Sequence, residues 1–104
     1  MLSFEEICAT GNVDLLDAKT CDLNDGLQIS VLKNQITSVE WFLEHGATNL
    51  DDSLRIACKN NLHNIAELLV DKGANPYKGL ATTKSNLIIG MLYAKINANK
   101  YKQR

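Results

Sequence analysis

Residues 50–76 read LDDSLRIACKNNLHNIAELLVDKGANP, and this stretch decides the fold. Hydrophobic residues recur in it at helical spacing in two runs, one before and one after Asn60-Asn61. Asparagine tolerates the left-handed backbone of a tight turn better than any residue except glycine, so Asn60-Asn61 ends the first run. We predict one helix from Asp52 or Ser53 to about Asn60, and a second from about His63 to Lys72 that stops at Gly73.

The same pattern occurs once more, immediately before this stretch. Residues 23–49, LNDGLQISVLKNQITSVEWFLEHGATN, align with residues 50–76 so that Asn34 meets Asn61 and Gly46-Ala47 meets Gly73-Ala74. Apolar, turn and glycine positions coincide together, which indicates an internal repeat. The earlier copy therefore predicts a second helix pair, whose apolar positions are Leu27, Ile29 and Val31, then Val39, Trp41, Phe42 and Leu43.

The segment IACKNNLHNIAELLVDKGANP resembles the ankyrin repeat, which has a short first helix, an Asn-Gly break, an Ile-Val-x-Leu-Leu second helix and a closing Gly-Ala-Asp/Asn. The likeness is specific over 54–75, fair over 27–47 and weak elsewhere. Asp52-Ser53-Leu54-Arg55 replaces the usual Thr-Pro-Leu-His, and the spacing of 27 is shorter than the usual period of about 33. The missing residues fall where the family has its β-hairpin. The resemblance thus implies an all-α, short helix-pair solenoid with clipped or absent β-hairpins.

Both ends of the chain are predicted to be caps of this solenoid. Ser3-Phe4-Glu5-Glu6 is a capping box, and with Gly11 at the break it predicts a first helix pair over about 3–18. Leu80 stands close to where a further copy would place the counterpart of Leu54, and a closing helix is predicted beyond it from Leu87, Ile88, Met91, Leu92 and Ile96. The expected organisation is one domain, 1–104, made of about four helix pairs at 1–22, 23–49, 50–76 and 77–104.

Composition excludes several classes of protein. The chain has 104 residues, 45% hydrophobic and 22% charged, which is typical of one folded domain. No stretch approaches the roughly 20 apolar residues of a membrane span, and Glu5 and Glu6 stand where a secretory signal carries bases. We expect a cytoplasmic or nuclear protein that does not act at a membrane.

No motif predicts catalysis or metal binding. Phosphate-loop, GxSxG and HExxH motifs are absent, so the chain is not expected to be an enzyme. Three cysteines without a CxxC pair argue against disulfides and zinc, and neither His45 nor His63 stands at a ligand spacing. We expect Cys8 and Cys58 to be small core residues, and neither a cofactor nor a metal is predicted.

The resemblance instead implies binding of another protein on a concave face. In ankyrin proteins that face includes the loop before each first helix and the outward, C-terminal positions of that helix. The matching positions here are Asn24, Leu32, Lys33, Asp51, Lys59, Asn60 and Tyr77. Leu32 is the strongest candidate among these residues, because its counterpart Lys59 is expected to face solvent. Two interpretations of Leu32 remain open. It belongs to a contact patch for a partner, or it is an ordinary leucine that is exposed or packs against a neighbouring helix. Tyr77 is placed in a turn, where aromatic residues commonly anchor partners.

Two aromatic residues of the second helices need separate expectations. Trp41 falls on the position of Leu68 and is expected in the core. His63 stands where the family has an apolar residue, and we expect it to be half-buried and hydrogen-bonded.

The charge is unevenly distributed along the chain. Residues 1–52 carry ten acidic side chains against two lysines, a net charge of −8, whereas residues 53–104 carry nine basic against two acidic, a net charge of +7. A linear arrangement would make an electric dipole that steers a partner, although the split can equally serve solubility. It also allows weak head-to-tail self-association instead of a monomer.

Binding of a nucleic acid or an acidic partner through the basic C-terminal helix and tail is the weaker alternative to binding a protein on the concave face. The C-terminal tail holds Lys95, Lys100, Lys102 and Arg104 together with Tyr101 and has no acidic residue. The abundance of Asn, Lys and Ile is that of an AT-rich genome, and small free-standing ankyrin proteins of such sources are often similar to proteins that occupy a host factor. The leading prediction is a stoichiometric adaptor or inhibitor of another protein.

Overall fold

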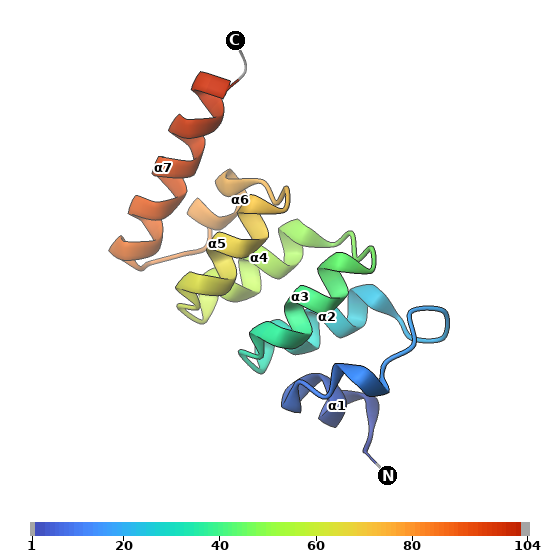
Figure 1. Cartoon of the computed structure of the whole chain (residues 1–104). Helices are drawn as coiled ribbons and strands as arrows, with labels where there is room; N and C mark the ends of the chain where they lie inside the picture. Colours follow the sequence, from blue (N-terminus) through green and yellow to red (C-terminus); the bar gives the residue numbers. More distant parts are fainter. Residues whose placement is uncertain (1, 103–104) are drawn as a thin grey trace. The chain divides into compact units, whose positions relative to one another are not determined.

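The computed structural model describes residues 2–102. Within them all regular secondary structure is helical, and there is no β-strand. This confirms the all-α prediction. The elements, shown in Figure 1, are α1 (Phe4–Thr10), the 3-10 turn η1 (Val13–Leu15), α2 (Leu23–Leu32), α3 (Ile36–Glu44), α4 (Leu50–Lys59), α5 (His63–Asp71), α6 (Pro76–Leu80) and α7 (Asn86–Lys102). None of these helices is long and apolar enough to cross a lipid bilayer.

The internal repeat is present in the helix boundaries. Helices α2 and α4 are equal in length, as are α3 and α5, and every boundary of the first pair recurs at the matching position of residues 50–76. Both turns between paired helices place asparagine in the left-handed region, with φ of 54° at Asn34 and 59° at Asn61. The predicted break positions are therefore confirmed.

The chain divides into two compact units, residues 1–49 and residues 50–104, which are described separately. In the first unit α2 packs against α1 and α3. The Ser3 hydroxyl accepts a hydrogen bond from the Glu6 N–H, the Glu6 side chain accepts one from the Ser3 N–H, and Gly11 ends α1 with a φ of 76°. The predicted capping box and break are thus confirmed. The core of this unit contains Cys8, Leu27, Val31, Val39 and Phe42.

The predicted first helix pair over 3–18 is only half formed. After α1 the chain makes the single 3-10 turn η1, and it then leaves helical geometry at Leu16. The Asp17 side chain accepts a hydrogen bond from the Lys19 N–H, and the Asp17 carbonyl accepts two more from Thr20 and Cys21. Such local turns compete with helix formation, which explains why no second helix extends to residue 18.

In the second unit α5 packs against α4 and α7, and α6 lies against α4 and α7, as Figure 1 shows. Its core contains Leu54, Ala57, Cys58, Ile65, Leu69, Ile88 and Leu92. Gly79 permits the close approach of α6, because a Cβ there would lie 3.0 Å from both Cys58 Sγ and Leu92 Cδ1. The predicted core cysteines, Cys8 and Cys58, are both buried.

Two predicted boundaries in this unit are wrong. Helix α4 begins at Leu50, so Asp52 and Ser53 lie inside it and do not cap it. The stretch from Asn75 to Lys78 is the start of helix α6, not a turn. The Asn75 side chain caps that helix by accepting from the Tyr77 N–H, and Pro76 occupies the first helical position, which proline favours.

Candidate protein-binding surfaces

Asn24, a predicted partner-binding residue, already holds the fold of its own unit together. Its Oδ1 accepts hydrogen bonds from the backbone N–H groups of Thr48 at 2.7 Å and Asn49 at 3.3 Å. Its backbone carbonyl accepts another from the Asn49 side chain at 3.1 Å. These bonds fasten the first turn of α2 to the segment that follows α3, so most of the polar capacity of Asn24 is used internally.

Asp51 makes the equivalent bond in the second unit. Its Oδ1 accepts from the Asn75 N–H at 2.7 Å and fastens the first turn of α4 to the segment after α5. We call the bonds of Asn24 and Asp51 the repeat clamps. The resemblance implied a partner contact at both positions, and the structure gives each one an internal role.

Leu32 and Lys33 lie at the opposite end of α2 from the first clamp. Leu32 is 58% exposed, so it packs only in small part against its own unit. The ammonium of Lys33 lies 3.7 Å from Glu5 Oε1, in an ion pair in which both side chains are well exposed. Exposed pairs of this kind contribute little to stability, so both residues remain accessible to a partner.

The corresponding residues of the second unit are also exposed. Lys59 is the last residue of α4, and Asn60 follows it with its side-chain amide donating to the Ile56 carbonyl at 2.8 Å. Tyr77 is 61% exposed on α6, although it lies in a helix and not in the predicted turn. The predicted site residues of this unit do not gather at one place, because Lys59 and the Asp51 clamp are at opposite ends of α4.

The predicted basic tail is largely a helix. Helix α7 continues to Lys102, and Arg104 lies outside the described residues. Lys95 is not free, because its Nζ lies 2.7 Å from Asp71 Oδ1 and 3.5 Å from Glu67 Oε2 on α5. The hydrogen bond to Asp71 is the main cause that raises the pKa of Lys95 above its usual value. Lys100 is exposed.

Trp41 is half-buried, so the prediction that it belongs to the core is wrong. Its ring stacks on His45 with a centroid distance of 3.9 Å, and it meets the buried Phe42 edge-on at 5.1 Å. The His45 ring is held in place by a 2.7 Å contact between its Nδ1 and the Trp41 carbonyl. The prediction that His63 is half-buried is confirmed, but its ring makes no hydrogen bond among the described residues; it lines a groove of the second unit.

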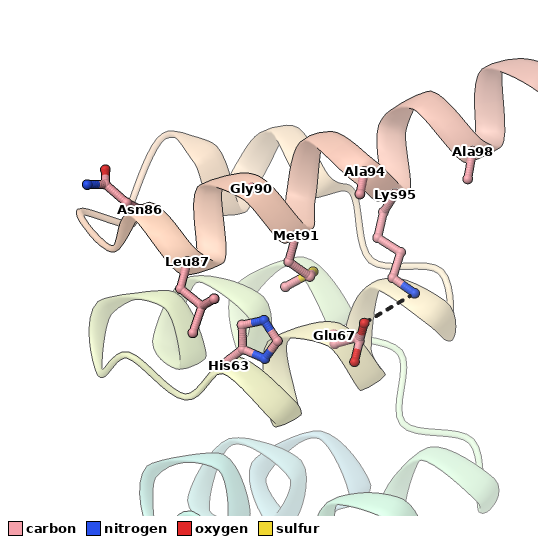
Figure 2. Close-up of a pocket in the computed structure, with 9 residues that line it drawn as sticks. All are labelled: His63, Glu67, Asn86, Leu87, Gly90, Met91, Ala94, Lys95 and Ala98. Carbon is pink, nitrogen blue, oxygen red and sulfur yellow. Dashed lines mark ion pairs between the residues drawn. The ribbon is translucent and has the colours of Figure 1, made fainter.

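That groove was not predicted. It has a volume of about 540 Å³ and runs between α5 and α7. Figure 2 shows Leu87 and Met91 directed from α7 toward His63 on α5, with the ion pair between Lys95 and Glu67 farther along the helix. The remaining lining residues are small or polar, namely Asn86, Gly90, Ala94 and Ala98.

Leu87 gives the groove its apolar character. The sequence predicted Leu87 in the closing helix, but its side chain is 69% exposed, whereas Ile88 and Leu92 fill the core. Above Gly90 the surface is open, because no heavy atom would lie within 4 Å of a Cβ built there. The sequence signal that could have indicated this face is the regular spacing of Gly90, Ala94 and Ala98, which places all three on one side of a helix.

Within residues 2–102 no three histidine, cysteine or acidic side chains are grouped so that they could hold a metal ion. No protein-family model, curated protein or solved structure matches this chain. The candidate sites therefore depend on the geometry of the chain itself.

Proposed function

We propose that this chain is a divergent, short-period ankyrin-type protein that acts as a stoichiometric adaptor or inhibitor by binding another protein. The two copies of the internal repeat have matching helix boundaries, and this match supports the ankyrin assignment. A helix pair of the same length, a left-handed asparagine turn and a repeat clamp occur in residues 23–49 and again at matching positions from residue 50 onward. Repeat proteins of this kind present extended surfaces for partners.

The groove between α5 and α7 is the observation that carries the binding proposal. A leucine that is 69% exposed at the edge of a hollow leaves apolar surface in water, and a partner that covers it recovers that free energy. Each fully buried leucine contributes about 1.5–3 kcal/mol. Leu87 is consequently the strongest single candidate for an anchor among the described residues of the second unit.

The occupant that fits this groove is a helix of the partner protein. Gly90, Ala94 and Ala98 follow one another at regular helical intervals, so an incoming helix can approach the α7 backbone closely along that line. The end of the groove near Leu87 and Met91 is apolar. At its other end, Lys95 and Glu67 form an ion pair in which the two charges neutralise each other. An amphipathic helix with an apolar stripe matches such a groove.

The helix-end surface at Leu32 is the alternative binding face of the same function. It follows from the resemblance and is supported by the exposure of Leu32. Binding of nucleic acid through the C-terminal helix has less support, because Lys95 is occupied by two carboxylates.

The test compares variants of the two faces against a partner identified by crosslinking and then purified. Leu87→Glu places a charge in the α5–α7 groove, and Gly90→Leu adds a bulky side chain to the groove at a position where a Cβ meets no heavy atom within 4 Å. Leu32→Glu alters only the other face. Isothermal titration calorimetry is expected to give one-to-one binding that both groove variants abolish and Leu32→Glu retains.

Three results would count against the proposal. Loss of binding in Leu32→Glu alone would move the site to the helix ends. Retention by all three variants would show that neither face binds the partner. A saturable chemical conversion of the partner would show that the chain is an enzyme. Thermal unfolding of each variant controls for loss of fold.

A further inference from the structure

A second hollow in residues 50–104 is lined by two lysines. Lys59, from the end of α4, and Lys84, from the segment before α7, border a cavity of about 310 Å³ with Cys58, Asn61 and Thr82. No acidic side chain and no aromatic ring is part of this lining. The cavity therefore combines two positive charges with neutral polar groups.

All acidic side chains of this unit are engaged elsewhere. The sequence from 50 to 104 contains four of them, Asp51, Asp52, Glu67 and Asp71. Asp51 accepts from the Asn75 N–H, Asp52 pairs with Arg55 at 2.6 Å, and both Glu67 and Asp71 contact Lys95. None of these four carboxylates lines the cavity beside its two lysines.

The position of Lys84 is unfavourable for the stability of α7. It stands two residues before Asn86, the first residue of the helix, and the positive end of the helix dipole does not favour a cation nearby. Lys59 at the end of α4 has the opposite, favourable placement. Lys84 is therefore not placed where its charge would stabilise α7, and it borders the cavity together with Lys59.

The remaining wall of the cavity does not oppose an anion. Cys58 is 1% exposed, and burial raises the pKa of its thiol to about 11, so the group is neutral at physiological pH. The Thr82 hydroxyl donates to the Lys78 carbonyl at 3.1 Å and carries no charge. Asn61 holds its left-handed φ of 59° at the edge, and its amide can donate a hydrogen bond.

We propose that the cavity between Lys59 and Lys84 binds an acidic side chain of the partner protein. This inference rests on the proposed function and adds the chemistry of the partner, which would carry an aspartate- or glutamate-rich segment. A discrete cavity with two cations and no ring fits one or two carboxylates. Nucleic acid would need a longer row of cations, with rings on which bases could stack.

The experiment uses the ¹⁵N-labelled whole chain at low salt and three probes, namely a short polyglutamate peptide, inorganic phosphate and a short oligothymidylate. We expect polyglutamate to give saturable shifts of the amides of Lys59, Asn61, Thr82 and Lys84. The double variant Lys59→Gln, Lys84→Gln should weaken the affinity by roughly fivefold or more, as expected for the loss of two exposed ion pairs.

A matched control removes two other lysines of the same unit. The variant Lys72→Gln, Lys100→Gln has the same net charge but leaves the cavity intact, because neither residue lines it. We expect it to bind polyglutamate within twofold of wild type. An equal loss in the control would show that the attraction is diffuse and would overturn the proposal.

The other probes separate the remaining outcomes. If phosphate saturates the cavity and polyglutamate does not bind, the ligand is a free oxyanion and not an acidic segment. If the chain prefers oligothymidylate, the ligand is nucleic acid. Either result, or no saturable shift at all, overturns the inference. The proposed function would still stand if Leu87→Glu abolished partner binding, so the two failures are distinguishable.

Discussion

Lys95 on α7 and Asp71 on α5 form an ion pair with a Nζ–Oδ1 distance of 2.7 Å, and the same ammonium lies 3.5 Å from Glu67. One lysine thereby links the two helices that border the groove. The pair is only partly exposed on the lysine side, so it is stronger than a pair of freely solvated ions.

Removing this link is expected to destabilise the chain in a pH-dependent manner. Since the pKa of Lys95 is raised in the folded protein from 10.5, its contribution is fully present below that value and is lost as the pH rises through the raised pKa. Lys95→Met should lower the free energy of unfolding by about 0.5–1 kcal/mol at pH 8. Urea denaturation of both proteins at pH 8 and at a series of higher pH values through the titration of Lys95 measures the difference.

The same comparison includes its own control. Lys72→Met removes an exposed lysine that forms no ion pair among the described residues, and it should change the stability little at either pH. A deficit of Lys95→Met that stays the same across the whole pH series would mean that the lost contribution is packing of the side-chain stem.

Two buried serines are expected to respond in opposite directions to replacement by alanine. Ser53 is 0% exposed, and its Oγ has no hydrogen-bond partner among the described residues. Ser38 is equally buried, but its Oγ donates to the Cys8 carbonyl at 2.7 Å. Leaving a buried polar group unpaired costs about 1–3 kcal/mol, whereas alanine is the best helix former.

Ser53→Ala should therefore raise the free energy of unfolding by about 1 kcal/mol, and Ser38→Ala should lower it by about 1–2 kcal/mol. Thermal and urea unfolding of the two single variants measure both changes. A destabilised Ser53→Ala would show that its hydroxyl has a partner in solution, such as an ordered water molecule.

Two glycines within helices are expected to differ in the same way. A Cβ at Gly90 meets no atom within 4 Å, whereas a Cβ at Gly26 would overlap the ring of the buried Phe42. Gly90→Ala should stabilise α7 by about 0.5–1 kcal/mol, because glycine is a poor helix former. Gly26→Ala should cost about 1–3 kcal/mol, because the core around Phe42 cannot yield.

Equilibrium unfolding in urea measures these two changes in stability. The Gly90→Ala variant can also be tested for partner binding. Alanine at residue 90 leaves most of the groove open, so its effect on binding should be much smaller than that of leucine. A destabilised Gly90→Ala would indicate that another atom occupies the space above residue 90 in solution.

The repeat clamps are predicted to be structural contacts. Asn24→Ala loses the bonds that its Oδ1 accepts from two backbone N–H groups as well as its contacts with the Thr48 hydroxyl, Asp51→Ala loses one bond, and each change should lower the free energy of unfolding by about 1 kcal/mol. Asp51→Asn keeps an acceptor oxygen and should remain close to wild type. Unfolding measurements on the three variants test this, and partner affinity measured on the folded variants should be unchanged.

The predictable parts of the fold are those that short-range backbone chemistry determines. Asn34, Asn61, Gly11 and the Ser3 capping box indicate their turns and caps regardless of what packs around them. The start of α4 was misplaced, because Asp52 and Ser53 are good cap residues as well as tolerable helix residues. Choosing between those roles depends on tertiary contacts such as the bond from Asn75 to Asp51.

The candidate site was less predictable for a related reason. Helix α7 has apolar residues on several sides, so its sequence pattern does not indicate which of them other helices cover. Leu87 and Ile88 are adjacent in sequence, yet the first is exposed and the second is buried. Exposure of Leu32 was suggested by the repeat alignment, because its counterpart is the lysine at residue 59.

The repeat clamps also bear on how the chain folds. Each clamp joins groups that are 24 or 25 residues apart within one copy of the repeat, and the entropic cost of closing a loop grows only slowly with its length. During synthesis, every atom of the first clamp is present once residue 49 has been added, so residues 23–49 can secure their helix pair before the second copy exists.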